Sequence, residues 1–257
     1  MKVSLIDSHV HLNDDSIYQR LEEVITAAVN VGVDQFICIG YDRFHSERAL
    51  SIANEFDSVY AAVGFHPASA HEIGDLELNW LRERAKKERV VAIGEIGLDY
   101  YWDKSQIEAQ KRVFIEQIKI ANELNLPISV HMRDAVLDTY QIIKQYKRPD
   151  LLGVMHCYSG SHESMNDFIE LNMYISLAGP VTFKNARVSK EVAVKVPLER
   201  LVIETDSPYL APQPVRGKPN EPKYLCHIAR EIAGLKGLSY EEVALATTRN
   251  AQRLFGL

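Results

Sequence analysis

Short apolar, β-branched runs alternate with longer amphipathic segments along nearly the whole chain. A continuous apolar run of this kind is typical of a parallel strand that is buried on both faces. Apolar residues at intervals of three and four positions instead predict a helix with one buried face. Eight runs fit the strand pattern, and they lie near residues 3–7, 34–39, 59–63, 90–94, 127–130, 152–155, 173–177 and 201–204.

The segments between these runs predict helices over 18–31, 44–55, 75–87, 105–124 and 134–146, with two more near 221–234 and 239–254. Strict alternation of eight strands with helices favours the α/β class and a single (β/α)₈ barrel of the TIM type. An open, doubly wound sheet is the structural alternative. It usually carries fewer strands and a glycine-rich nucleotide loop, and no G-x-G-x-x-G occurs here. The length of 257 residues suits one barrel, so we expect one domain over residues 1–257.

Residues that can bind a metal follow several of the predicted strands. Parallel strands of a barrel bring their carboxyl ends to the same face, where the active site of this fold lies. The first strand is followed by two histidines separated by one residue, a spacing that points both side chains to one face. The candidate ligands are His9, His11, Glu95, His131, His156 and Asp206.

Five or six nitrogen and oxygen ligands exceed what one tetrahedral ion needs, so we expect two divalent ions about 3.5–4 Å apart. The mixture of imidazole and carboxylate leaves Mg²⁺, Mn²⁺ and Zn²⁺ open. Glu95 ends an apolar strand, where a carboxylate binds metal or else forms an ion pair with a Lys or Arg. We expect catalytic roles for Glu95 and for Asp206, which can take a proton from an attacking water. Glu204 shares a face with Asp206 and could support a ligand or the water.

Other residues near the strand ends could hold an anionic substrate. His66 precedes Pro67 in a restricted loop, and Arg133 points the same way as His131, as an anion clamp would. Arg216, Lys218 and Asn220 stand in a Pro-rich segment, 211–223, which predicts a loop. The alternatives are that His66 is a loop histidine without a role, that Arg133 pairs with a nearby acid, and that the segment 211–223 is a solvated loop. The aromatic residues 100–102 could stack on bases or simply pack.

Composition narrows the class of protein. A net charge of −6 gives no strong electrostatic footprint for duplex nucleic acid, so a polyanionic substrate would be gripped over a short stretch. Cys38, Cys157 and Cys226 form no C-x-x-C pair, which argues against a disulfide framework or thiolate zinc site. The amino-terminal segment is too short and polar for a signal peptide, and no apolar run approaches 18 residues. We therefore expect a cytoplasmic protein without a membrane partner.

Taken together, the motifs resemble the TatD family of metal-dependent deoxyribonucleases, within the amidohydrolase-like barrel superfamily. In many relatives in that superfamily a modified lysine bridges the metals, whereas a glutamate stands in the fourth-strand position here. The matching stretches are DSHVHL at 7–12, GFHP at 64–67, GEIGLDYY at 94–101, PISVHMRDA at 127–135, HCYSG at 156–160, ETDSPYLAP at 204–212, RGKPNEP at 216–222 and RNAQRLFG at 249–256.

The resemblance implies a ligand set and an activity. The first metal would be held by His9, His11, Glu95 and Asp206, and the second by Glu95, His131 and His156. His66 would lie near a substrate phosphate. The implied activity is hydrolysis of DNA, as a 3′→5′ exonuclease acting on single-stranded ends, without an obligate protein partner. A small-molecule amidohydrolase that cleaves an amide, lactone or ester is the alternative enzyme, and a non-catalytic binding barrel is the alternative outside enzymes.

Overall fold

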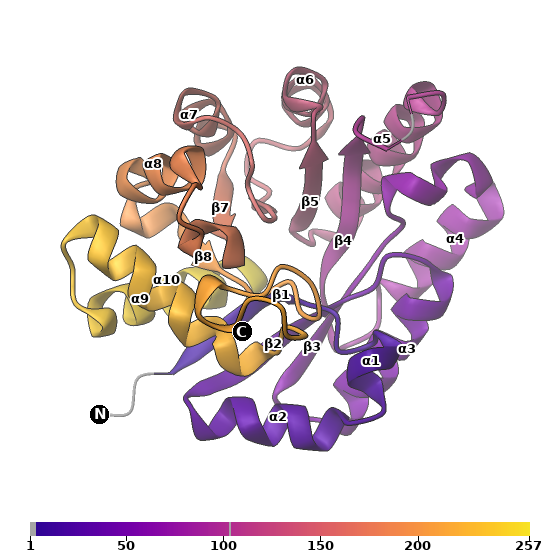
Figure 1. Ribbon diagram of the computed structural model, residues 1–257. Helices are drawn as coiled ribbons and strands as arrows, with labels where there is room; N and C mark the ends of the chain where they lie inside the picture. Colours follow the sequence, from indigo (N-terminus) through magenta and orange to yellow (C-terminus); the bar gives the residue numbers. More distant parts are fainter. Residues whose placement is uncertain (1–3, 103) are drawn as a thin grey trace.

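The computed structural model describes residues 4–102 and 104–257. In this part of the chain, eight parallel strands form one sheet in the order of the sequence, from β1 to β8 (Figure 1). The strands are β1 (Leu5–Val10), β2 (Val33–Ile39), β3 (Val59–Val63), β4 (Val90–Asp99), β5 (Ile128–Arg133), β6 (Gly153–Met155), β7 (Met173–Leu177) and β8 (Leu201–Ile203).

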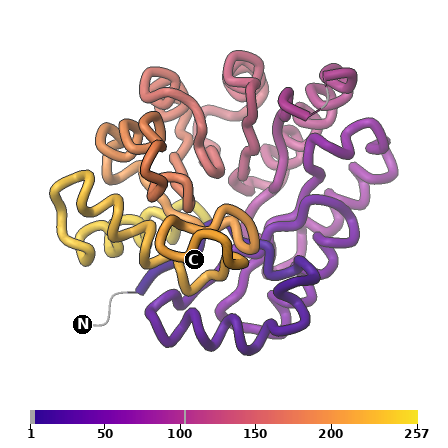
Figure 2. Tube along the Cα trace, viewed as in Figure 1, coloured from indigo at the N-terminus to yellow at the C-terminus, as the bar shows by residue number. Residues whose placement is uncertain are grey.

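Helices connect the strands and lie around the outside of the ring that the strands form (Figure 2). They are α1 (Asp15–Tyr18), α2 (Leu21–Asn30), α3 (Arg43–Glu55), α4 (Asp75–Arg84), α5 (Ile107–Leu124), α6 (Val136–Tyr146), α7 (His162–Glu170), α8 (Arg187–Lys195), α9 (Leu225–Lys236) and α10 (Tyr240–Phe255). The prediction of a (β/α)₈ barrel is confirmed. Among the described residues, no helix has the length and apolar character that would let it cross a bilayer.

The ring closes between β1 and the segment that follows β8. His11 N donates to Ser207 O at 2.9 Å, and Asp206 N donates to His9 O at 3.0 Å. Beside these bonds, the Thr205 hydroxyl donates to an Asp7 carboxylate oxygen at 2.5 Å. These bonds hold the residues after β8 beside the histidines of β1, although the two segments are almost 200 positions apart in the sequence.

One end of the barrel is filled by apolar side chains. A buried cluster joins residues of seven strands, among them Ile6, Ile37 and Tyr174, to Leu254 and Phe255 near the end of α10. Stacked side chains of this kind make the interior of a TIM barrel a packed core rather than a pore. The polar side chains that could bind a ligand lie toward the other, carboxyl end of the strands.

The strand that carries Glu95 is longer than the pattern predicts. Residues 90–94 were expected, but β4 runs to Asp99, with an irregular register against β5 between Ile93 and Ile96. Gly97 makes this path feasible, because its φ is 141° and a Cβ there would overlap the carbonyl oxygen of His131. The extension carries both Glu95 and Asp99 to the mouth of the barrel.

Smaller differences have local causes. The pattern did not predict α7 or α8, because each of these helices has only nine residues and buries only two side chains, which leaves few apolar positions to mark its inner face. The predicted loop 211–223 contains a short 3₁₀ turn, Gln213–Val215, and a second one, Pro222–Tyr224, begins at its end. The first predicted strand began at residue 3, which lies outside the described residues, and β1 continues to Val10.

Candidate metal centre

Four ligand atoms converge where β1, β4 and the segment after β8 meet. His9 Nε2 lies 3.3 Å from His11 Nε2 and 3.7 Å from an oxygen, Oδ1, of Asp206. The same Asp206 oxygen is 3.4 Å from His11 Nε2. Glu95 Oε2 lies 3.7 Å from His9 and 4.0 Å from His11. The three separations among His9, His11 and Asp206, 3.3–3.7 Å, are those expected for ligand atoms bonded at about 2.0–2.3 Å to one tetrahedral ion.

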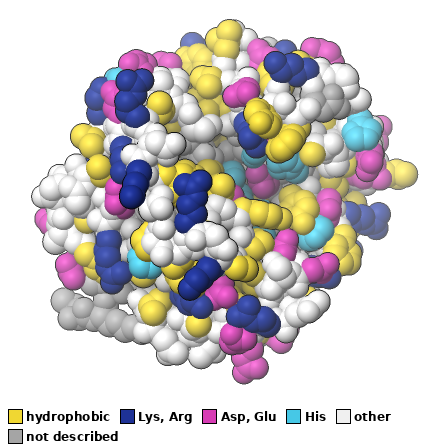
Figure 3. All heavy atoms as spheres, viewed as in Figure 1, with side chains coloured by type: hydrophobic (Ala, Val, Ile, Leu, Met, Phe, Trp, Pro, Cys, Tyr) yellow, Lys and Arg dark blue, Asp and Glu magenta, His cyan; other side chains and the backbone are white. Residues whose placement is uncertain are grey.

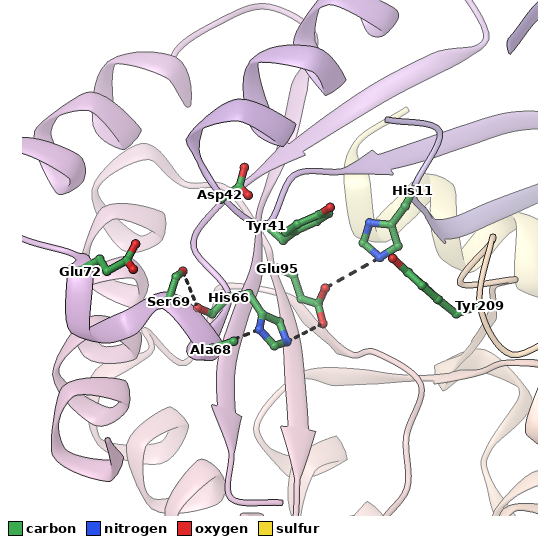
Figure 4. A pocket seen from close by; sticks show the side chains of 9 residues that line it. All are labelled: His11, Tyr41, Asp42, His66, Ala68, Ser69, Glu72, Glu95 and Tyr209. Carbon is green, nitrogen blue, oxygen red and sulfur yellow. Dashed lines mark hydrogen bonds and ion pairs between the residues drawn. The ribbon is translucent and has the colours of Figure 1, made fainter. Parts of the chain in front are cut away.

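The other oxygen of Glu95 faces a second group of histidines. Glu95 Oε1 lies 2.9 Å from His131 Nδ1, 3.6 Å from His156 Nε2 and 3.7 Å from His66 Nε2. Figure 4 shows the Glu95 carboxylate between His11 and His66, with one oxygen directed to each. Glu95 as a whole residue is only 5% exposed. One buried carboxylate thus lies between two groups of ligand atoms.

Carboxylates behind two of the histidines orient their rings. Asp99 Oδ2 lies 2.9 Å from His131 Nε2, so the other ring nitrogen, Nδ1, faces Glu95. Glu204 Oε1 lies 2.7 Å from His156 Nδ1, and Ser176 Oγ donates to the second oxygen of Glu204 at 2.5 Å. Metal-binding histidines generally have such a partner on the far nitrogen, which fixes the tautomer and raises the basicity of the ligand.

His11 is oriented in the same manner by the backbone. Its Nδ1 lies 3.2 Å from the carbonyl oxygen of Ile39, which can only accept a hydrogen bond. The proton of a neutral His11 is therefore on Nδ1, and the lone pair is on Nε2, toward Asp206 and His9. The donor set and its orientation fit a divalent cation.

Comparison with known proteins supports the same interpretation. Residues 6–256 match the family model described as TatD related DNase. The chain belongs to the TatD family. It is 47% identical over 251 residues to the uncharacterized metal-dependent hydrolase YabD of Bacillus subtilis strain 168, covering 98% of each chain. It is 32% identical over 258 residues to a protein of Citrobacter rodentium named 3'-5' ssDNA/RNA exonuclease TatD, again covering 98% of each.

A solved structure agrees over the full length. The chain superposes on YJJV, a TatD homologue from Escherichia coli K12, with a TM-score of 0.94, 30% identity and complete coverage of both chains. As a member of the TatD family, the protein is a metal-dependent hydrolase. Three groups of ligand atoms at the barrel mouth could hold its metal: His9 with His11 and Asp206, His9 with Glu95 and His156, and His66 with Glu95 and His131.

The electrostatics of this TatD site favour positive charge between its carboxylates. Burial alone would raise the pKa of Glu95, but the surrounding histidines, led by His156, hold this pKa well below its ordinary value. Burial alone would lower the pKa of His156, yet Glu204 and Glu95 raise it to about 10. The carboxylate of Glu95 is therefore ionised where it faces the histidines, and a cation beside it is favoured.

His66 differs from the other histidines that lie around Glu95. These histidines, with Glu95 and Asp206, are called here the ligand cluster, or simply the cluster. Its Nδ1 accepts a hydrogen bond from Ala68 N at 3.1 Å, so a neutral ring carries its proton on Nε2. Burial lowers the pKa of His66 to about 4, which leaves the ring neutral at physiological pH. His66 consequently presents an N–H group, rather than a lone pair, toward Glu95. This arrangement suits a hydrogen bond to a substrate anion better than a metal bond.

Arg133 lies at the mouth beside the cluster. It lines a pocket together with His131, His156 and Asp206. Its guanidinium carbon is 3.8 Å from the centre of the Tyr101 ring and makes no ion pair with any residue that the structure describes. The alternative of a pair with a neighbouring acid therefore finds no support in the described chain, and the guanidinium can receive an anion.

Unlike Arg133, the candidate residues of the loop after β8 do not line the pockets beside the cluster. Asn220 is buried, and its side-chain amide donates to Thr205 O at 2.8 Å and to Tyr209 O at 2.6 Å. Arg216 is exposed and lies over the ring of Phe183, at 4.7 Å. Neither residue, nor exposed Lys218, lines the two pockets that the cluster borders. Asn220 thus holds the segment that carries Asp206 rather than presenting its amide to the pockets.

No role for Asp99, the partner of His131, was predicted from the sequence. The usable signal was its spacing of four residues from Glu95, which puts both on one face of an extended strand. The bend at Gly97 obscured that relationship, since it could not be read from the apolar pattern.

Proposed function

We propose that the protein is a 3′→5′ exonuclease that hydrolyses the phosphodiester bonds at the ends of single-stranded DNA with two divalent cations. The observation that carries the proposal is the Glu95 carboxylate, which faces one group of ligand atoms with each oxygen. The guanidinium of Arg133, which forms no ion pair within residues 4–102 and 104–257, lies beside that cluster and favours an anionic substrate. The name of the Citrobacter relative, a 3'-5' ssDNA/RNA exonuclease, agrees with this substrate class.

The proposed ligands divide into two sets that share Glu95. The first cation would be held by His9, His11, Glu95 and Asp206, and the second by Glu95, His131 and His156. When bound, such a pair neutralises phosphate charge, lowers the pKa of water and stabilises the leaving oxygen. Mg²⁺, Mn²⁺ and Zn²⁺ all suit this mixture of nitrogen and oxygen ligands.

The remaining steps fall to side chains at the mouth. Oδ1 of Asp206 faces the histidine pair, so its other oxygen can take the proton of the attacking water. The Nε2–H of His66 donates to a phosphate oxygen without adding charge. Arg133 binds a second phosphate oxygen through its planar fork. Glu204 keeps the ring of His156 in place and does not touch the substrate.

A small-molecule amidohydrolase is the second candidate. One of the two pockets beside the cluster is lined by Asp42 and Glu72 and, among the described residues, by no Lys or Arg. Such a lining suits a neutral substrate better than a polyanion. The same metal ligands could polarise a carbonyl group as readily as a phosphoryl group.

The test uses metal-stripped protein to which Mg²⁺, Mn²⁺ or Zn²⁺ is added back. The substrates are single-stranded DNA labelled at its 5′ end, the matched duplex, and a panel of lactones and carboxylic esters. We expect stepwise shortening of the single strand from its 3′ end, and no activity in Glu95→Ala. Hydrolysis of the esters without any cleavage of DNA would replace the proposal with the amidohydrolase alternative.

A further inference from the structure

The ligand cluster around Glu95 lies between two pockets of different chemistry. The acidic pocket is lined by His11, Tyr41, Asp42, His66, Ala68, Ser69, Glu72, Glu95 and Tyr209, and has a volume of about 440 Å³. The basic pocket is lined by His131, Met132, Arg133, His156, Cys157, Ser159, Pro180, Asp206, Tyr209 and Leu210. Figure 3 shows histidine and acidic side chains at the floor of a hollow in this face, with hydrophobic side chains near its rim.

A third pocket continues the basic pocket away from the cluster. The two pockets have Cys157, Ser159 and Pro180 in common, so they form one groove, called here the basic groove. The groove reaches the first turn of α8 at Arg187 and Ser189. It therefore leads from the metal ligands across the loops that follow β6 and β7 to the outer ring of helices.

Charge separates the two sides of the cluster. The basic groove carries Arg133 and Arg187, neither of which has an ion pair with a residue in 4–102 or 104–257. On the other side, the acidic pocket carries the carboxylates of Asp42 and Glu72. Each of these two has a histidine as its neighbour, and no Lys or Arg within the described chain lines that pocket.

We infer that the strand of the substrate lies along the basic groove, and that its terminal nucleoside enters the acidic pocket. The inference rests on the proposed function and adds the path of the strand. Every internal nucleotide carries a phosphate, which Arg133 and Arg187 attract and which Asp42 and Glu72 repel. The terminal nucleoside has no phosphate beyond the bond to be cleaved, so the acidic pocket accepts it.

The acidic pocket also has the shape and lining for one nucleoside. Its volume lies in the usual range for small-ligand pockets. Tyr41 and Tyr209 line it on the side of His11, and Tyr209 is 49% exposed, which leaves an aromatic face for a base. A single nucleoside in the acidic pocket and a longer strand in the basic groove describe an enzyme that removes one nucleotide at a time.

The first test compares Arg187→Ala with the matched control Arg253→Ala. Arg253 is also exposed and lines a pocket at the opposite end of the strands. The substrates are single-stranded oligonucleotides from two to twelve nucleotides. We expect the loss of kcat/KM in Arg187→Ala to grow with length, to about fivefold on the longest, with no such trend in the control. The slope of log KM against log salt should fall by about 0.7 for the long substrates.

The second test addresses the acidic pocket with ends that carry a terminal phosphate. The wild-type protein should cleave 3′-hydroxyl ends faster than 3′-phosphate ends, because the added charge of about −1.5 to −2 meets Asp42 and Glu72. In Glu72→Lys this preference should shrink, by up to about fivefold for an exposed charge.

The outcomes separate the two proposals. If no oligonucleotide of any length is cleaved, the proposed function fails and the strand path fails with it. If oligonucleotides are cleaved but the fold-change in kcat/KM of Arg187→Ala is the same at every length, only the strand path is overturned. A terminal-phosphate preference that Glu72→Lys leaves unchanged overturns the assignment of the acidic pocket.

Discussion

Asp99 Oδ2 lies 2.9 Å from His131 Nε2, on the side of the imidazole ring opposite the nitrogen that faces Glu95. This contact fixes the ring and its tautomer. An amide in place of the carboxylate would weaken both effects, so Asp99→Asn should lower metal affinity by about 10- to 100-fold. Isothermal titration with Mn²⁺ measures the change. Asp150→Asn, at an exposed pair with Arg148, is the control, and equal affinity in both variants would refute the role of Asp99.

Glu95→Gln tests the shared carboxylate with little change in volume. The substitution removes the charge that both groups of histidines face, so we expect kcat/KM to fall by more than about 100-fold together with metal content. Circular dichroism should show an unchanged fold. Activity near that of the wild type, in protein that has lost its metal, would show that hydrolysis does not depend on this cluster.

How much of this site the sequence predicts depends on the kind of interaction. Strand ends of a barrel share one face whatever the details of packing, and therefore His9, His11 and Asp206 could be brought together from the apolar pattern alone. Asp99 could not be assigned to His131, because its position depends on the close approach of Gly97 to β5.

The loop after β8 shows the same difference between what local sequence predicts and what tertiary contacts decide. The residues of 211–223 could be predicted as a loop, since Pro and Gly mark it locally. Nothing local indicates that the amide of Asn220 is buried against Thr205 O and Tyr209 O. Helices α7 and α8 were missed for a related reason, because tertiary packing rather than a long apolar period stabilises them.

Arg133→Ala should act on the substrate and not on the metal. The guanidinium lies over Tyr101 and lines the basic pocket, and a hydrogen bond from a charged group contributes enough binding energy for a loss of about 10- to 100-fold in kcat/KM on single-stranded DNA. Arg133→Lys should recover only part of the loss, since a lysine lacks the planar fork. A parallel loss of Mn²⁺ affinity in Arg133→Ala would mean that the residue supports the cluster instead.

Metal binding should stabilise the folded protein. The ligands come from β1, β4 and β5 and from the segments that follow β1, β6 and β8, so they are brought together only in the folded chain. At a free metal concentration about 100 times the dissociation constant, one site adds about 2.7 kcal/mol to the free energy of unfolding. Thermal melting with and without Mn²⁺ measures the rise in Tm. Glu95→Ala should show little rise, whereas an equal rise would place the stabilising ion elsewhere.

A pH effect is expected far from the site. Burial lowers the pKa of Lys147 to about 8, while its ammonium donates to Leu151 O at 2.6 Å. Between about pH 8 and 10 the unfolded chain binds more protons than the folded one at this residue, so its contribution to the free energy of unfolding rises with pH. Denaturant unfolding gives the free energy of unfolding of the wild type and of Lys147→Met at pH 7 and pH 9.5. The difference between these two free energies should change in favour of the wild type at the higher pH. A difference that stays constant would contradict the shifted pKa.

Counting the bound ions tests the central claim most directly. We would titrate metal-stripped protein with Mn²⁺ and determine the number of ions per chain in the wild type, Asp206→Asn and Glu95→Ala. Two ions are expected in the wild type, one strongly held ion in Asp206→Asn, and none held strongly in Glu95→Ala, because Glu95 faces both groups of histidines. A single ion in the wild type, or two ions in Glu95→Ala, would contradict a centre in which this carboxylate joins two cations.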